Sequence, residues 1–203
     1  LAVDDSSYND QFGTSVALDG DTALVSAVND DASCNGTNIN CGAGYIFIRS
    51  SNTWAVQQKL VADDPEANSY FGWSTALSDN TILIGALWND STCSGTDINC
   101  GAAYVFSRSG NLWTQQQKLH ASAPGNGDEF GRSIALDGDT ALIGSGKDDT
   151  SCSGNGINCG AAFIYTYSRD SWFTQQKITA ENVVNTNNFG IAVALDGDTA
   201  LIG

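Results

Sequence analysis

A segment of 59 residues repeats along this chain, and this repeat restricts the possible folds more than any other feature of the sequence. Each copy begins with the pair Phe-Gly, at Phe12, Phe71, Phe130 and Phe189. The letters ALDGDTAL at positions 17–24 return unchanged at 135–142 and 194–201. Because neighbouring copies of one small unit bury a continuous core when they stack, such a period indicates a repeat architecture.

Each repeat contains four short segments with the character of β-strands. In the first repeat these segments lie at 12–18, 22–27, 42–49 and 54–60, and read FGTSVAL, TALVSA, GAGYIFIR and WAVQQKL. The second is nearly continuous apolar sequence, which is typical of a strand buried on both faces. Gln and Lys in the fourth favour a solvent-exposed outer edge. Asp19-Gly20 favours a tight hairpin turn between the first two strands, because Gly adopts positive φ without strain.

Four antiparallel strands per repeat, with small residues in the first and polar residues in the last, are typical of a β-propeller blade. We therefore predict an all-β fold, a β-propeller-type array of four-stranded antiparallel blades in a single unit. Blades are expected at 12–70, 71–129 and 130–188, after the end of a preceding repeat at 1–11 and before the first two strands of a fourth blade at 189–203. A linear β-solenoid or a row of separate hairpin modules is the alternative.

The number of blades bears on how the chain assembles. A propeller closes with at least about four complete blades, whereas this sequence contains three and the first two strands of a fourth. We expect the chain to be a segment of a longer array, or a subunit whose neighbours cover its ends. The apolar segment TALIG at 199–203 would then pair with an adjacent repeat or with another copy of the chain.

Three features of each unit resemble the FG-GAP repeat: the opening Phe-Gly, an apolar strand ending in Gly-Ala, and a second Gly-Ala that opens an aromatic strand. FG-GAP repeats build the propeller head of integrin alpha subunits and occur in many bacterial and algal extracellular proteins. The chain is similar to the bacterial-type form over essentially its whole length. The resemblance implies a propeller fold and a role in adhesion, ligand binding or scaffolding.

The sequence departs from the calcium-binding members of that family. Their blades carry a long acidic loop between the first two strands, whereas this chain has only a short turn such as 19–22. Calcium prefers about six to eight oxygen ligands, and a tight turn with two carboxylates does not supply them. The other acidic loop residues, which we expect to be solvated, are Asp30, Asp31, Asp148 and Asp149. We predict no metal site and no cofactor.

Six cysteines form three pairs that occupy the same place in each repeat. The pairs are Cys34 and Cys41, Cys93 and Cys100, and Cys152 and Cys159. Six cysteines allow fifteen pairings, and the repeat symmetry favours the local one. A local disulfide would restrain its loop by about 2–3 kcal/mol. Zinc is the alternative, although the spacing is longer than in usual zinc sites and no histidine is adjacent. Disulfides indicate an extracellular protein, secreted or on the cell surface.

Two glycosylation sequons fit an extracellular location. Asn35-Gly36-Thr37 lies inside the first cysteine loop, and Asn89-Asp90-Ser91 lies just before the second. In a eukaryotic source both would be candidate acceptors of N-linked glycans. The alternative is that such triplets arise by chance in a chain rich in Asn and Thr.

Composition argues against several classes of function. The chain has 23 acidic and 8 basic residues and a net charge of −15, which disfavours nucleic-acid binding. The sequence contains no apolar run long enough to span a membrane. The single histidine, His120, has no counterpart in the other repeats, and the turn aspartates recur in every unit. Because catalysis needs an asymmetric set of residues, we predict no catalytic site and no enzyme.

Two non-enzymatic functions remain. The first is a structural protein whose repeats assemble with copies of the chain, or with adjacent repeats, into a fibre, coat or matrix. The alternative is an adhesion or ligand-binding module for a glycan or a surface protein. Trp73 and Trp88 are the only tryptophans outside the periodic set, and both lie in the second repeat. These two residues are the candidate binding surface.

Overall fold

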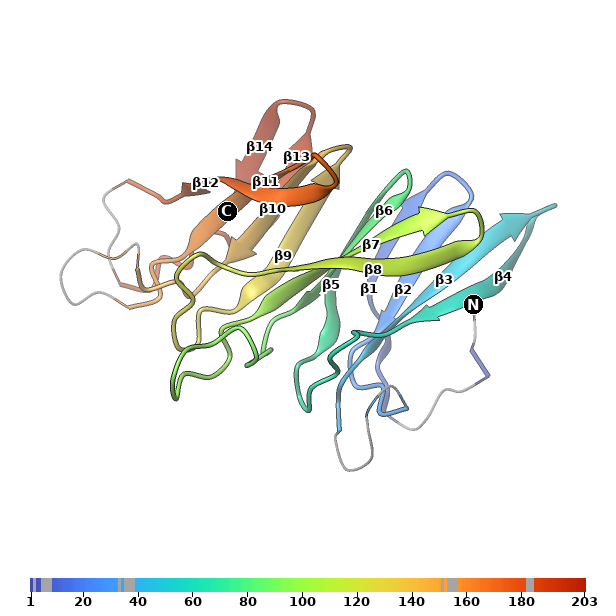
Figure 1. The fold of residues 1–203 in the computed structure, drawn as a ribbon, viewed down its shortest axis with the longest axis horizontal. Coiled ribbons are helices and arrows are strands. Elements are labelled where there is room, and N and C mark those ends of the chain that lie inside the picture. The colour runs from blue at the N-terminus through green and yellow to red at the C-terminus, as the bar shows by residue number, and fades with distance from the viewer. Residues whose placement is uncertain are drawn as a thin grey trace.

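The computed structural model describes residues 1, 3–4, 9–32, 34, 39–150, 152, 157–181 and 185–203 (Figure 1). Every regular element in these residues is a β-strand, and none is a helix long and apolar enough to cross a membrane. The first sheet contains β1 (Phe12–Asp19), β2 (Thr22–Ala27), β3 (Ala43–Ser50) and β4 (Thr53–Leu60). The second contains β5 (Phe71–Ser78), β6 (Thr81–Ala86), β7 (Ala102–Ser109) and β8 (Leu112–Leu119). The third contains β9 (Phe130–Asp137), β10 (Thr140–Ser145), β11 (Ala161–Ser168) and β12 (Ser171–Ile178), and a final pair is formed by β13 (Val193–Asp196) and β14 (Thr199–Ile202).

The strands of each sheet pair antiparallel and in chain order. The first strands of successive sheets lie against one another, β1 on β5, β5 on β9 and β9 on β13. The sheets therefore follow one another in chain order across the molecule (Figure 1). This arrangement confirms the predicted all-β, propeller-type array of four-stranded blades, and the array is not closed in this chain.

The core lies between adjacent blades and is built mainly from their second and third strands. All six residues of β2 are buried, as its continuous apolar sequence predicted. Leu24 and Ile46 of the first blade share one hydrophobic cluster with Ile84 and Trp113 of the second. Removing apolar surface from water contributes about 25 cal/mol per Å², so the blades are stabilised chiefly by packing on their neighbours.

The phenylalanine of the Phe-Gly pair anchors each full blade. Phe71 is 1% exposed, and its ring meets Tyr104 and Phe106 edge-on with centroid distances of 5.3 and 6.0 Å. Phe130 is fully buried and contacts Phe163 of the third blade in the same way. Edge-to-face contacts of this kind add about 0.5–1.5 kcal/mol beyond burial. This packing explains why a phenylalanine recurs at the start of each blade.

Adjacent blades also touch backbone to backbone near their inner strands. A Cβ atom on Gly85 would lie 2.1 Å from the carbonyl oxygen of Gly131, a distance that no side chain tolerates. The hydroxyl of Ser74 donates to the same carbonyl at 2.7 Å. The arrangement recurs one repeat later at Gly144, Gly190 and Ser133. The inner part of a blade therefore accepts only small residues.

Candidate functional site

Each cysteine pair forms a disulfide within its own repeat. The Cα–Cα distances are 5.6 Å for Cys34–Cys41, 5.5 Å for Cys93–Cys100 and 5.4 Å for Cys152–Cys159. All six cysteines of the sequence are bonded. The second cysteine of each pair is buried, directly before the third strand of its blade.

The disulfide loops also join each blade to the next one. The amide of Phe71, the first residue of the second blade, donates to the carbonyl of Cys41 at 3.2 Å. The amide of Phe130 donates in the same way to Cys100 at 2.9 Å. Further bonds of this ladder run from Asn68 to Ile39, from Gly127 to Ile98 and from Thr186 to Ile157. Restraining a loop therefore also restrains the junction between two blades.

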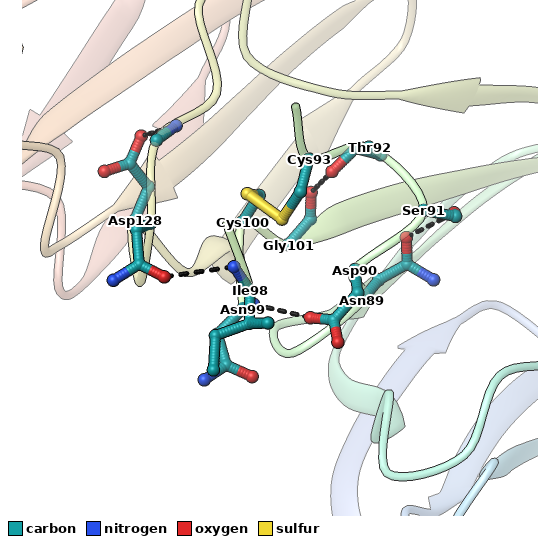
Figure 2. Close-up of a disulfide and its surroundings, with 12 residues drawn as sticks. Asn89, Asp90, Ser91, Thr92, Cys93, Ile98, Asn99, Cys100, Gly101 and Asp128 are labelled. Carbon is teal, nitrogen blue, oxygen red and sulfur yellow. Dashed lines mark hydrogen bonds between the residues drawn. A yellow bond between two sulfur atoms is a disulfide. The ribbon is translucent and has the colours of Figure 1, made fainter. Parts of the chain in front are cut away.

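Side chains fix the loop around the second disulfide (Figure 2). The carboxylate of Asp90 accepts a hydrogen bond from the amide of Asn99, across the base of the loop. The hydroxyl of Thr92 donates to the carbonyl of Gly101 at 2.9 Å. Ser91 donates to the amide oxygen of Asn89 at 2.8 Å. Asp90 therefore helps to hold the disulfide loop in its conformation and is not a free acidic group.

Two of the acidic loop residues predicted to be solvated are instead buried. The carboxylates of Asp30 and Asp148 are 0% exposed, and each forms an ion pair of 2.8 Å with a lysine of the fourth strand, Lys59 or Lys177. The Lys59 ammonium lies 5.2 Å from the centre of the Tyr45 ring. The fourth-strand lysine, which the sequence places at a solvent-exposed outer edge, also turns inward, because its side chain reaches the carboxylate past the third strand.

The second repeat replaces this aspartate with Asn89, whose side chain is fully buried. Its Nδ2 atom donates to Glu66 Oε2 at 2.8 Å and to the Tyr104 hydroxyl at 3.2 Å. Burial is the main cause of a raised pKa for Glu66. Nδ2 is the atom to which a glycan at Asn89 would attach, and glycosylation of this residue stays a prediction from the sequence. The other predicted acceptor, Asn35, lies outside the described residues.

The candidate residue Trp88 belongs to a cluster at the junction between the second and third blades. Its ring meets Tyr70 edge-on at 4.8 Å, and its indole N–H donates to Glu129 Oε1 at 3.4 Å. Lys147 binds the same carboxylate at 2.7 Å, and Arg132 pairs with its other oxygen. Glu129 is only 4% exposed, whereas Trp88 is 38% exposed. A buried carboxylate thus holds one aromatic and two cationic side chains at the surface.

Trp73, on β5, adjoins the same cluster through its backbone. Its amide donates to the carbonyl of Tyr70 at 3.1 Å, and its side chain is 38% exposed. We name the six residues the Trp88 cluster: Tyr70, Trp73, Trp88, Glu129, Arg132 and Lys147. The sequence prediction included the two tryptophans but missed the other four. A signal was present, because the residues at these positions differ in chemical type from repeat to repeat, whereas the Phe-Gly pair between them does not change.

The turn aspartates link neighbouring blades. Asp19 Oδ2 accepts the amide of Asp79 at 2.7 Å, and Asp137 Oδ2 accepts the amide of Gly197 at 2.6 Å. Ser78, at the same position of the second blade, accepts the amide of Gly138 at 3.1 Å. Among the described residues, no group of three or more His, Cys, Asp or Glu is placed to hold a metal ion.

Asp128 is a further buried carboxylate that the sequence analysis missed. It is 1% exposed and accepts the amide of Gly125 at 2.7 Å through Oδ2. Burial raises its pKa to about 6, with a smaller contribution from repulsion by Asp148 and Asp149. The corresponding residue of the second repeat is Ser69. The raised pKa of Asp128 therefore results from the packing of this junction and does not mark an open site.

His120 is exposed, and its Nδ1 lies 2.8 Å from the carbonyl oxygen of the next residue, Ala121. The described residues thus define a repeat protein with inter-blade junctions and an asymmetric surface cluster.

The fold and these junctions define a β-propeller-type repeat protein. The family model of the FG-GAP repeat matches residues 1–47, 54–106, 113–165 and 172–203, which is most of the sequence. The chain therefore belongs to the FG-GAP repeat family. No curated protein matches the chain. The FG-GAP repeat is a binding or structural fold without enzymatic function, and with three disulfides it fits an extracellular adhesion-type module.

Proposed function

We propose that this chain is an extracellular, non-enzymatic binding module that contacts a surface protein through the Trp88 cluster. One observation carries the proposal: the strand framework recurs from repeat to repeat, whereas the residues of this cluster differ between repeats. The position of Trp88 is Asn29 in the first repeat and Lys147 in the third. The position of Trp73 is Thr14 in the first and Arg132 in the third. A cluster whose residues differ between repeats gives one part of an otherwise regular scaffold a surface of its own, as a binding function requires.

The composition of the cluster supports this function. Trp, Tyr and Arg are the residues most enriched where protein interfaces gain their binding energy. The Lys147 side chain is 44% exposed and that of Arg132 is 28% exposed, so both cations are accessible to a partner. Glu129 holds them from a buried position. Pre-ordered side chains reduce the entropy that association costs.

The backbone fixes two residues of the cluster in place. Tyr70 and Glu129 occupy equivalent positions and have φ values of 53° and 55°, and the same conformation occurs at Gln11 and Asn188. A non-glycine residue in this left-handed region costs about 1–3 kcal/mol and persists where surrounding structure enforces it. The residue before each Phe-Gly therefore has a fixed backbone in every repeat, and the side chains at this position set the difference between repeats.

The test compares two single variants that each borrow a residue from another repeat. Trp88→Asn introduces the residue of the first repeat, and Phe173→Thr introduces that of the second repeat, Thr114, at an exposed position of β12. Labelled chain is added to cells of the producing organism and measured by flow cytometry. We expect binding to fall at least about tenfold for Trp88→Asn and to be unchanged for Phe173→Thr. Equal binding by both variants would contradict the proposal.

A second candidate function is structural assembly with copies of the chain. It is supported by the regularity of the blade contacts, in which Ser74 donates to Gly131 and Ser133 donates to Gly190 with nearly equal distances of 2.7 and 2.8 Å. A face that accepts the next repeat has the shape to accept another copy. Electron microscopy and sizing over a range of concentrations test this function. Filaments or sheets would support it, and a monomer at every concentration would exclude it.

A further inference from the structure

A cavity of about 300 Å³ lies between the second and third blades, beside the hairpin turns. Its walls include Ser107 of β7, Trp172 of β12, and the turn residues Asn80, Asp139 and Asp170. The disulfide loops and the Trp88 cluster lie at the other ends of the strands (Figure 1). The cavity is thus separate from the surface discussed above.

A smaller side chain at one lining position contributes to the space. The same pair of hydrogen bonds closes both blade junctions. Between the first and second blades, the Gln58 side chain bonds the Trp113 backbone at 2.7 and 2.8 Å. Between the second and third blades, the Gln117 side chain bonds the Trp172 backbone at 2.9 and 2.8 Å. Ile48 of the first blade packs against the core of its junction. The second blade has Ser107 at that position. A serine in place of this partly buried isoleucine leaves part of that volume unfilled.

The cavity offers polar groups that the protein itself does not use. In the part of the chain that the structure describes, the side chains of Asn80, Asp139 and Asp170 form no hydrogen bond or ion pair. Trp172, which is only 5% exposed, lines the same space. Polar side chains that make no bond to the protein thus border an open cavity beside an aromatic residue.

Aromatic rings form one wall of the cavity. Tyr167 lies with its ring 5.5 Å from that of Trp172 at an angle of 46°, and Tyr167 is 40% exposed. A ring face beside hydroxyl-binding carboxylates and amides matches the two surfaces of a pyranose, which has apolar C–H faces and a polar rim. The volume is at the small end of ligand sites, which suits one sugar residue rather than a large ligand.

Charge indicates a neutral ligand. Two aspartates line the cavity, and the chain carries a net charge of −15, so anionic ligands are disfavoured. The one lining cation, Arg108, donates through Nε to the carbonyl of Gly110 at 2.9 Å and lies 5.8 Å from the Trp113 ring centre. We propose that this cavity binds a neutral pyranose residue of a glycan. The site goes beyond the proposed function, because it takes a different ligand at the other end of the blades.

Saturation-transfer NMR tests this with four probes, the methyl glycosides of glucose, galactose, mannose and N-acetylglucosamine. We expect at least one probe to bind the wild-type chain. Ser107→Ile fills the cavity with the residue of the first blade and should abolish the signal. The matched control is Thr166→Ile, which makes the corresponding change in the third blade and should bind like wild type. Asp139→Ala alters an exposed turn residue and should weaken binding about tenfold by removing one hydrogen-bonding carboxylate.

Three results would overturn the proposal. The first is no signal from any probe with the folded wild-type chain. The second is undiminished binding by both Ser107→Ile and Asp139→Ala. The third is sugar binding that Trp88→Asn abolishes while Ser107→Ile retains it, which would assign the sugar to the Trp88 cluster. Absence of cell binding by the wild-type chain, with its sugar binding intact, would instead contradict only the proposed function.

Discussion

The Lys177 ammonium donates hydrogen bonds of 2.8 Å to both oxygens of the buried Asp148 carboxylate, although the two residues lie 29 positions apart. The pair joins the loop after β10 to the outer strand β12 of the same blade. Asp30 and Lys59 repeat it in the first blade. The charged residues of a strongly acidic chain thus take part in the internal framework of its blades.

Removing the lysine should destabilise the chain more than removing the aspartate. Lys177→Met leaves a buried, uncompensated carboxylate, and we expect the free energy of unfolding to fall by about 3 kcal/mol. Asp148→Asn places the residue of the second repeat at this position, leaves a lysine that is 28% exposed, and should cost less. Urea denaturation of both variants measures the difference. A loss below about 0.5 kcal/mol for Lys177→Met would show that the pair is not needed.

Removing a disulfide should loosen a blade junction as well as its own loop. In Cys93→Ser/Cys100→Ser we expect a loss of about 2–3 kcal/mol. We also expect faster hydrogen exchange at the Phe130 amide, which donates to the Cys100 carbonyl. The Phe71 amide, at the intact first junction, is the internal control. Unchanged exchange at Phe130 would limit the disulfide to a local role. Peptide mapping without reduction should recover only the three local pairs.

Asp128 should make stability depend on pH in the opposite sense to an ordinary ion-paired carboxylate. Its folded-state pKa of about 6 lies above the usual value of 3.8. Between these values the folded chain binds more protons than the unfolded chain, so this residue stabilises the fold at low pH and the effect is lost as pH rises through 6. Relative to Asp128→Ser, which carries the residue of the second repeat, wild type should gain about 2 kcal/mol from pH 7 to pH 4.5. A difference that is constant with pH would contradict the assignment.

The two sequons should behave differently on expression in a eukaryotic secretory system. Asn89 should carry no glycan in the folded, secreted chain, because its Nδ2 atom is buried and bonded to Glu66. Asn35 remains a predicted acceptor on its sequence. Intact mass before and after glycosidase treatment, followed by glycopeptide mapping, assigns occupancy. A glycan on Asn89 in folded material would refute this account of the second repeat.

The sequence predicted the strands and the blade order because the repeat supplies several copies of one pattern. It predicted local cysteine pairing for the same reason. It did not predict that Asp30 and Asp148 are buried, since the lysines that neutralise them come from a distant strand. The bond between Trp88 and Glu129 spans 41 positions and two blades. The second repeat has Ser107 where the first has Ile48. The cavity at this position depends on how adjacent sheets pack, and the sequence of one repeat does not show that packing.

The central claim is that the recurring strands form the scaffold and that binding takes place at the Trp88 cluster, whose residues differ between repeats. A triple variant tests it most directly, in which the residues of the first repeat replace part of the Trp88 cluster: Tyr70→Gln, Trp73→Thr and Trp88→Asn. Cell binding by flow cytometry is measured beside thermal unfolding. We predict that the variant unfolds cooperatively at nearly the temperature of the wild-type chain and binds no cells. Undiminished binding by this folded variant would contradict the claim.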